Sequence, residues 1–161
     1  MRYWRGYTVI EVMITLALLG VVTALAVPSF RELIDRNRLS AATNDLVSAF
    51  LTTRSEAVKR ECRVSISRNG TWNVGWTANV LTDLAGCNSL ELINHETSSA
   101  KLGVTTNGNI GNAVIYSPDG RAVGLAGGNN DFFTLTYNGQ TRTVCLTQNG
   151  RPYVPKGGSC P

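Results

Sequence analysis

The chain has 161 residues, of which 43% are hydrophobic, and a formal net charge of +4. This length holds one domain plus an appendage, because single domains cluster at roughly 100–150 residues. So small a positive excess does not require a polyanionic partner, and an ordinary solvated surface explains it as well. The apolar residues are concentrated at residues 7–27, whereas residues 63–161 are rich in Gly, Asn, Thr and Ser. The first segment therefore suits lipid and the second suits water.

A continuous apolar stretch runs from Tyr7 to Val27, and Glu11 is its only charged residue. These 21 residues can cross a hydrocarbon core of about 30 Å at about 1.5 Å per residue. A secretory signal instead has an apolar core of about 7–15 residues followed by a small-x-small cleavage site, and no such site follows Val27. We therefore expect an anchor that stays with the protein. Arg2 and Arg5 precede it, so the positive-inside bias predicts a cytoplasmic N-terminus and an external C-terminal bulk.

Glu11 is out of place in a membrane helix, because an unpaired carboxylate there costs several kcal/mol. One partner would be the α-amine created by cleavage after Gly6, which would leave Glu11 five positions into the new chain. The alternative is a glutamate near the interface that extends to the lipid headgroups. Both interpretations remain open from its position alone.

The segment after Pro28 reads as an amphipathic helix. A proline can bend a helix here without ending it, because membrane or filament neighbours can satisfy the freed carbonyl. Apolar and small residues recur at steps of three and four, which predicts one buried stripe along the helix. The stripe consists of Leu39, Ala42, Leu46, Phe50, Thr53 and Ala57.

The rest of the chain is strand-like. Alternation predicts strands at 63–67 and 71–76 around an Asn-Gly turn, with Trp72, Val74 and Trp76 on one core-facing side. Residues 77–112 read as polar surface loops. Further strands are expected at 113–116, 132–137, 141–146 and 153–154.

The four cysteines all follow the apolar stretch and form no CxxC pair, and His95 is the only histidine. This spacing does not fit a zinc or thioredoxin-type site. An even number beyond a membrane anchor indicates two disulfides in an oxidising compartment, with four free thiols as the alternative. Three pairings are possible, of which sequence proximity favours the two short loops. These would join Cys62 to Cys87 and Cys145 to Cys160.

The hexapeptide from Gly6 to Glu11, Gly-Tyr-Thr-Val-Ile-Glu, resembles the processing signal of type IV prepilins and type II secretion pseudopilins, with Tyr7 in place of the usual Phe. Pro28 matches the helix-bending proline of these proteins. The resemblance implies that a prepilin peptidase cuts after Gly6 and methylates Tyr7, and that Glu11 neutralises the N-terminal amine of a neighbouring subunit. It divides the chain into a leader (1–6), a transmembrane and filament-core helix (7–28) and a periplasmic head (29–161).

Four short segments resemble the GspH/FimT/FimU group of minor pilins. They are Ala-Val-Lys-Arg at 57–60, Trp-Asn-Val-Gly-Trp at 72–76, Ser-Pro-Asp-Gly-Arg at 117–121 and Asn-Gly-Arg-Pro at 149–152. The resemblance implies a pilin-like α+β fold, in which a long N-terminal helix packs on an antiparallel sheet.

The first functional hypothesis is therefore a minor pilin that helps to start or cap a type IV pilus, with the inner membrane and other minor and major pilins as partners. A type II secretion pseudopilin is an alternative with the same anchor chemistry. No cofactor, metal site or catalytic constellation is expected, and His95 with its acidic neighbours reads as part of a solvated loop.

A second alternative is a DNA-binding pilin for natural transformation. The FimT branch uses a Gly-Arg-x-Arg motif, but residues 150–153 read Gly-Arg-Pro-Tyr and lack the second arginine. Arg142, Arg151 and Lys156 remain as candidate phosphate contacts, with Tyr153 available to stack on a base. The competing interpretation is a simple turn inside a loop closed by Cys145 and Cys160.

Overall fold

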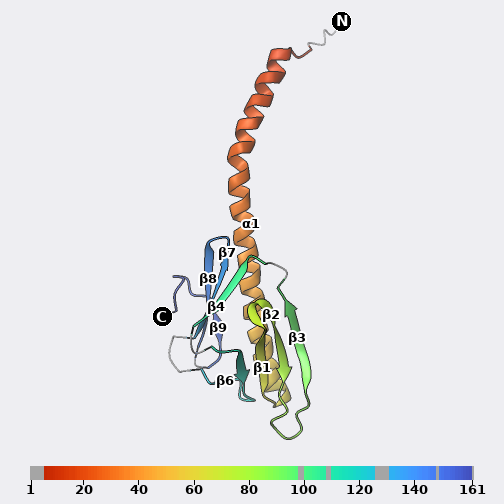
Figure 1. Ribbon diagram of the computed structural model, residues 1–161, viewed down its shortest axis with the longest axis vertical. Helices are drawn as coiled ribbons and strands as arrows, with labels where there is room; N and C mark the ends of the chain where they lie inside the picture. The colour runs from red at the N-terminus through yellow and green to blue at the C-terminus, as the bar shows by residue number, and fades with distance from the viewer. Residues whose placement is uncertain (1–5, 98–99, 108–109, 126–130, 148, 161) are drawn as a thin grey trace.

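The computed structural model describes residues 6–97, 100–107, 110–125, 131–147 and 149–160. Within these ranges it contains one long helix and nine strands. The first half of the helix projects as a stalk, and the second half is embedded in a head formed by two β-sheets (Figure 1). The predicted pilin-like α+β fold is confirmed.

Helix α1 spans Val9–Arg60, which are 52 residues and about 78 Å at about 1.5 Å per residue. The helix continues through Pro28 and is gently curved (Figure 1). It ends at Glu61, which takes the left-handed conformation with a φ of 55°. There the N–H of Cys62 donates to the carbonyl of Ala57, which satisfies one of the last carbonyls of the helix.

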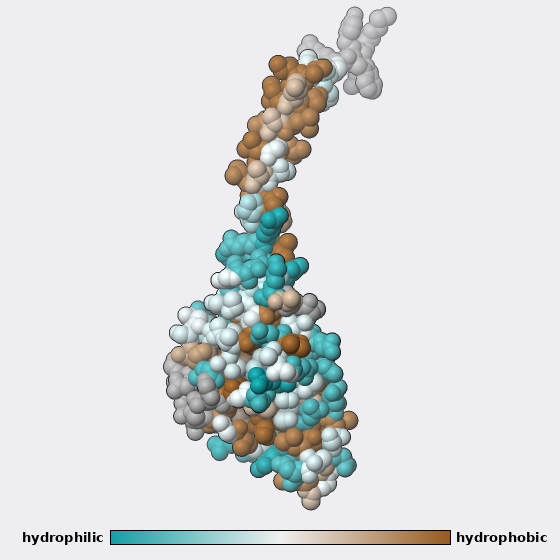
Figure 2. Space-filling model, viewed as in Figure 1, coloured by the Kyte–Doolittle hydropathy of each residue, from teal (hydrophilic) through white to brown (hydrophobic). Residues whose placement is uncertain are grey.

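The two halves of α1 have opposite surroundings. Apolar side chains cover the projecting half on the visible face, whereas polar side chains surround the neck where the helix enters the head (Figure 2). The predicted stripe is confirmed except that Ala42 is only half-buried, and Thr43 and Ala49 lie in the core as well. The buried residues of α1 are Leu39, Thr43, Leu46, Ala49, Phe50, Thr53 and Ala57.

The first sheet has five strands in the order β3-β2-β1-β5-β6, and every neighbouring pair is antiparallel. Its strands are β1 (Val64–Asn69), β2 (Thr71–Val80), β3 (Leu90–Glu96), β5 (Ala113–Tyr116) and β6 (Ala122–Val123).

The second sheet has four antiparallel strands in the order β4-β7-β8-β9. Its strands are β4 (Leu102–Thr106), β7 (Phe132–Tyr137), β8 (Gln140–Leu146) and β9 (Pro152–Tyr153). Helix α1 contacts strands of both sheets, so the core lies where the helix and the two sheets meet.

Aromatic side chains from the three layers meet in this core. The ring of Phe133 on β7 lies 5.2 Å from that of Phe50 on α1 and 4.9 Å from that of Trp72 on β2, measured between centroids. The contact with Trp72 is edge-to-face, an arrangement that aromatic quadrupoles favour. The helix and both sheets are therefore joined by one apolar cluster.

Two expectations about the strands are wrong. Residues 77–112 are not mainly loop, because β2 extends to Val80 and both β3 and β4 lie in this segment. Val74 does not share the core face of Trp72 and Trp76, since it is 54% exposed. Arg68 pairs with Trp76, yet the next residue, Asn69, pairs with Thr71, so residues 72–75 bulge out of the ladder and lose the simple alternation.

Gly75 makes this bulge possible. Its φ is 143°, and a Cβ at this position would collide with the backbone carbonyl of His95 on β3. Glycine avoids both the strain and the collision, which allows β2 to bend while it still pairs with β3.

Candidate functional site

The first turn of α1 holds the residues of the predicted processing site. Gly6 and Tyr7 are exposed, and Thr8 caps the helix, its hydroxyl accepting a hydrogen bond of 3.3 Å from the backbone N–H of Glu11. Glu11 thus lies in the first turn, where a negative charge interacts favourably with the helix dipole. Its carboxylate makes no hydrogen bond or ion pair with the other residues that the structure describes.

The helix beyond Glu11 has no cover within the described chain. Among the described residues, α1 is the one helix long and apolar enough to cross a membrane. None of its most apolar 18-residue window is buried. Fifteen large apolar side chains of this half are exposed, from Val9 at 79% to Ile34 at 47%. Exposed apolar surface of this extent marks an interaction with lipid or with other apolar helices.

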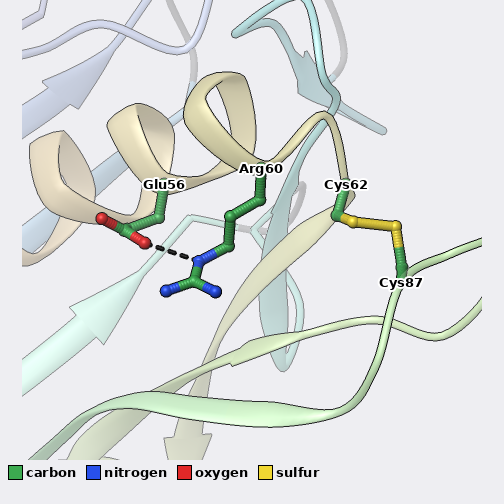
Figure 3. The surroundings of a disulfide bond; sticks show 4 residues. All are labelled: Glu56, Arg60, Cys62 and Cys87. Atoms are coloured by element: carbon green, nitrogen blue, oxygen red, sulfur yellow. Dashed lines mark hydrogen bonds and ion pairs between the residues drawn. A yellow bond between two sulfur atoms is a disulfide. The ribbon is translucent and has the colours of Figure 1, made fainter.

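At the opposite end of α1 a disulfide fixes the helix to the first sheet. Cys62 is bonded to Cys87 in the β2–β3 connection, with 5.9 Å between the Cα atoms (Figure 3). This is one of the two pairings that sequence proximity favours.

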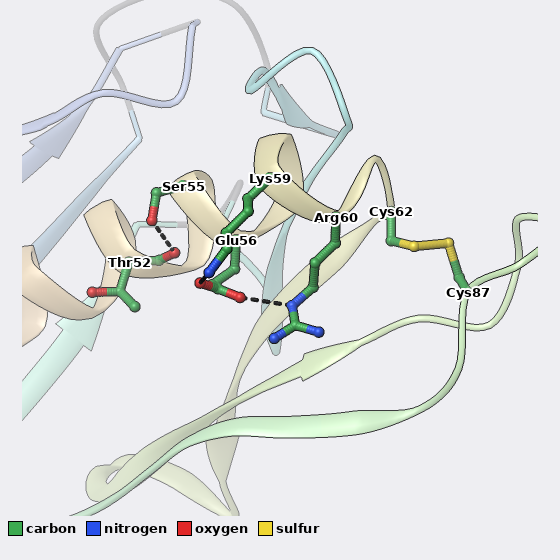
Figure 4. A network of polar contacts seen from close by, with 7 residues as sticks. All are labelled: Thr52, Ser55, Glu56, Lys59, Arg60, Cys62 and Cys87. Atoms are coloured by element: carbon green, nitrogen blue, oxygen red, sulfur yellow. Dashed lines mark hydrogen bonds and ion pairs between the residues drawn. A yellow bond between two sulfur atoms is a disulfide. The ribbon is translucent and has the colours of Figure 1, made fainter.

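The last turn of α1 is also braced by Glu56, which accepts from Arg60 and lies 3.7 Å from the ammonium of Lys59 (Figure 4). The hydrogen bond from Arg60 and the charge of Lys59 hold the pKa of the Glu56 carboxyl below its ordinary value.

The second disulfide closes the C-terminal segment over β8. Cys145 on β8 is bonded to Cys160, with 5.8 Å between the Cα atoms and a sequence separation of 15. The hydroxyl of Thr143 donates to the carbonyl of Gly158 at 2.7 Å, which holds the same segment two residues before the disulfide. The segment after β9 is thus tied to β8 at two points.

Inside this closed loop, hydrogen bonds join Thr147 to Gly150 and to Arg151 in the pattern of a tight turn. The N–H of Gly150 donates to the carbonyl of Thr147 at 2.7 Å, and the N–H of Thr147 donates to the carbonyl of Arg151 at 3.0 Å. The hydroxyl of Thr147 accepts from the N–H of Arg151 as well. The Gly-Arg-Pro segment therefore has the geometry of a turn, and its arginine is held by its backbone while the residue remains exposed.

Gly150 joins this turn to the first sheet. Its carbonyl accepts a 2.8 Å hydrogen bond from the hydroxyl of Tyr116, a fully buried residue of β5 whose pKa is strongly raised by burial. Gly150 has a φ of 73°, and a Cβ there would lie 2.6 Å from the Tyr116 ring and 2.9 Å from the backbone N of Ala122. Only glycine fits this close contact between the two sheets without displacement.

The structure does not bring the three candidate phosphate contacts together. Arg142 lies on β8 opposite Leu135, whereas Arg151 bonds through its backbone to Thr147 beyond the other end of that strand. Five residues of strand separate these positions, or about 16 Å. Lys156 lies in the segment after β9, near the hydrogen bond that joins Thr143 to Gly158.

Contacts of Gly150 link the turn of Arg151 to a segment that carries two arginines distant in sequence. Gly150 packs on Ala122, which follows Arg121, and the guanidinium of Arg54 donates from its Nε to the carbonyl of Gly120 at 2.8 Å. We call Arg54, Arg121 and Arg151 the basic edge. The sequence analysis did not single out Arg54, because its contact with the 117–121 turn spans 66 residues and leaves no local pattern.

One exposed acid lies beside the basic edge, because the carboxylate of Asp119 accepts from the backbone N–H of Arg121 at 3.0 Å. Asp131 is only 2% exposed, and its burial raises the pKa of its carboxyl above the ordinary value. No group of three or more His, Cys, Asp or Glu residues in the described ranges is placed to hold a metal ion.

Comparisons with known proteins match both the N-terminal segment and the head. Residues 1–27 match the prokaryotic N-terminal methylation motif, and residues 42–150 match the family of type II transport protein GspH. A fimbrial protein of Pseudomonas aeruginosa is 25% identical over 117 residues, which cover 71% of this chain and 75% of that protein. The type IV major fimbrial protein FimA of Dichelobacter nodosus is 28% identical over 79 residues, covering 49% of this chain and 47% of FimA.

Solved structures show the same fold. The crystal structure of the type IV minor pilin FimU of Pseudomonas aeruginosa superposes with a TM-score of 0.63 and 23% identity. The match covers 79% of this chain and 95% of the FimU chain. A second crystal form of FimU superposes with a TM-score of 0.59.

The close contact of Gly150 with Tyr116 and Ala122 leads to a prediction about stability. Gly150→Ala should lower the free energy of unfolding by about 1–3 kcal/mol, because the methyl group strains a left-handed backbone and collides with Tyr116 and Ala122. Urea unfolding of the full chain in detergent, followed by tryptophan fluorescence, measures this change. The matched control is Gly157→Ala, where φ is ordinary and no atom lies within 4 Å of the added methyl. Equal stability of the two variants would show that the close contact is not a constraint.

Proposed function

The chain belongs to the GspH/FimT/FimU family of type IV minor pilins, and we propose that it is incorporated into a type IV pilus as a minor subunit of the assembly-initiating tip complex. The observation that carries this proposal is the uncovered apolar half of α1, which begins with a single acid at its first turn. A soluble protein would have to expose this surface to water. A subunit that moves from membrane to filament buries it in both places.

The division of the chain follows from this role. Residues 1–6 are a leader removed by a prepilin peptidase, and Tyr7 becomes the methylated N-terminus. Residues 7–28 cross the inner membrane before assembly and lie in the filament core after it. Residues 29–161 form a head on the periplasmic side, where an oxidising environment supports the disulfides Cys62–Cys87 and Cys145–Cys160.

Glu11 provides the specific contact of assembly. A carboxylate with no partner among the described residues of its own chain is costly in hydrocarbon, and the cost is removed when a neighbour's N-terminal amine pairs with it. The hydrogen bond from the N–H of Glu11 to Thr8 fixes the first turn, so the acid stays close to the new N-terminus. Pro28, at the end of the apolar half, allows the stalk to curve toward its neighbours without ending the helix.

The head serves contact rather than catalysis. Polar groups of the head form hydrogen bonds in turns and at the helix end, and its cysteines form disulfides. The same architecture is found in FimU, which is described as a minor pilin. We favour a pilus over the piston of a type II secretion system because two disulfides benefit an exposed filament tip more than a short periplasmic structure.

The assembly role predicts the phenotype of Glu11→Ala. The variant should still be cleaved after Gly6, but its amount in sheared filaments should fall about tenfold, because the neighbouring amine loses its partner in an apolar environment. Mass spectrometry of membranes scores cleavage, and quantitative immunoblots of filaments score incorporation. Glu32→Ala is the control, since this acid pairs with Arg36 on the exposed neck of the same helix. Normal incorporation of Glu11→Ala would refute the pairing role.

DNA capture is a second candidate function, and the basic edge is the observation that favours it. The segments that carry its three arginines, in α1, the β5–β6 turn and the β8–β9 turn, are joined by contacts at Gly120 and Gly150, and Asp131 is buried. Guanidinium groups bind phosphate oxygens well. Tyr153, which is half-buried on β9, is the aromatic residue nearest in sequence to Arg151.

This candidate predicts a salt-sensitive gel shift of duplex DNA by the full chain in detergent. Arg151→Ala should weaken binding and lower the slope of log affinity against log salt by about 1, because one phosphate contact is lost. Lys59→Ala removes a similar charge outside the basic edge and should change the slope little. An absence of binding by the unaltered chain at low salt would exclude DNA capture by this subunit alone.

A further inference from the structure

Strand β3 leaves one side of the first sheet open. It is the terminal strand of the order β3-β2-β1-β5-β6, and in the described residues only β2 pairs with it. A bulge at Leu92 interrupts the pairing, since Ala78 pairs with Ile93 and Asn79 pairs with Glu91. The bulge confines the regular edge to Ile93–Glu96, a length that suits a local contact better than continuous strand pairing.

A groove runs between this edge and α1. Two hollows of about 420 Å³ and 250 Å³ lie along the helix and share Asp45 and His95 in their linings, so they form one feature. We call it the α1–β3 groove. The larger hollow, of about 420 Å³, has room for a guanidinium group.

The α1–β3 groove is suited to a cation. Asp45 on α1 and Glu96 on β3 place carboxylates on its two walls. The cation in its lining, Arg38, already donates to the hydroxyl of Tyr137 at 2.8 Å. Lys101 lies in the β3–β4 connection and does not line the groove. The ring of His95 stacks on Trp76 with 4.3 Å between centroids, which gives the groove a flat aromatic floor.

The complementary charge lies on the opposite side of the same head. The basic edge adjoins β6, so it lies at the edge of the five-stranded sheet opposite β3 (Figure 1). Four strand spacings separate these two strands, or about 19 Å. One head therefore presents an acidic groove on one side and exposed arginines on the other.

We propose that the α1–β3 groove receives the basic edge of a second copy of this chain, with Arg151 entering between Asp45 and Glu96. Such a contact is head-to-tail, so one subunit keeps its basic edge and the other keeps its groove free for further neighbours. This geometry suits a row of parallel heads whose stalks share one membrane or filament core. The inference rests on the proposed function as a filament subunit and adds a contact between heads to the one between stalks.

The test is photo-cross-linking of the full-length chain in cells. A photoreactive residue at the exposed position Asn94 on β3, in cells that hold two differently tagged copies, should join the two tags. Arg151→Glu and Glu96→Arg should each reduce the cross-linked product about tenfold, because like charges then face each other. The double variant should restore it. Lys59→Glu carries the same change of charge outside both surfaces and should leave the product unchanged.

Cross-linking that is insensitive to the single reversals, or not restored in the double variant, would overturn the proposed contact. A product that contains only a different protein would overturn the choice of a second copy. Incorporation into sheared filaments is scored in the same strains. Incorporation with charge-insensitive cross-linking would contradict the head contact alone, whereas its absence for the unaltered chain would contradict the proposed function.

Discussion

The rest of the structure depends on one constraint: a single helix has an apolar half that needs lipid or other helices around it and a second half that packs in a water-soluble head. Helix α1 runs for 52 residues, and the head covers only its second half. Within the head, Leu46, Phe50 and Ala57 are fully buried against the two sheets. In the stalk, the described chain offers no comparable cover, so lipid or other helices must supply it.

Two disulfides and one hydrogen bond between the sheets stabilise the head. The first disulfide ties the end of α1 to the β2–β3 connection, and the second ties the C-terminal segment to β8. Each restricts the unfolded chain, which favours the folded state in a domain of modest size. Between them, the hydrogen bond from Tyr116 to Gly150 joins the two sheets. Conformation is thus fixed near both ends of the head.

The sequence predicted the features that have a local pattern. The anchor, the buried stripe of α1 and strands β5 and β7 follow from clean periodicities. Strand β3 was missed because an edge strand carries polar residues such as Asn94 and Glu96, and its pattern resembles a loop. Val74 was assigned to the core because nothing in the alternation reveals that Gly75 allows β2 to bulge.

The candidate site divides in the same way. Gly6 and Glu11 form a compact motif, and their spacing is visible in the sequence. The basic edge is not visible, because the segments of Arg54 and Arg151 are linked only by tertiary contacts at Gly120 and Gly150. Sequence reasoning grouped Arg151 with Arg142 and Lys156, which share its stretch of chain, although the length of β8 separates Arg142 from Arg151.

The central claim is that the apolar half of α1 passes from membrane to filament after the leader is removed. Mass spectrometry of the N-terminal peptide, recovered from sheared and purified filaments, tests it most directly. The account predicts a peptide that begins at Tyr7 and carries one additional methyl group on its amine. Chain that is absent from the filaments, or that still carries residues 1–6 within them, would contradict it.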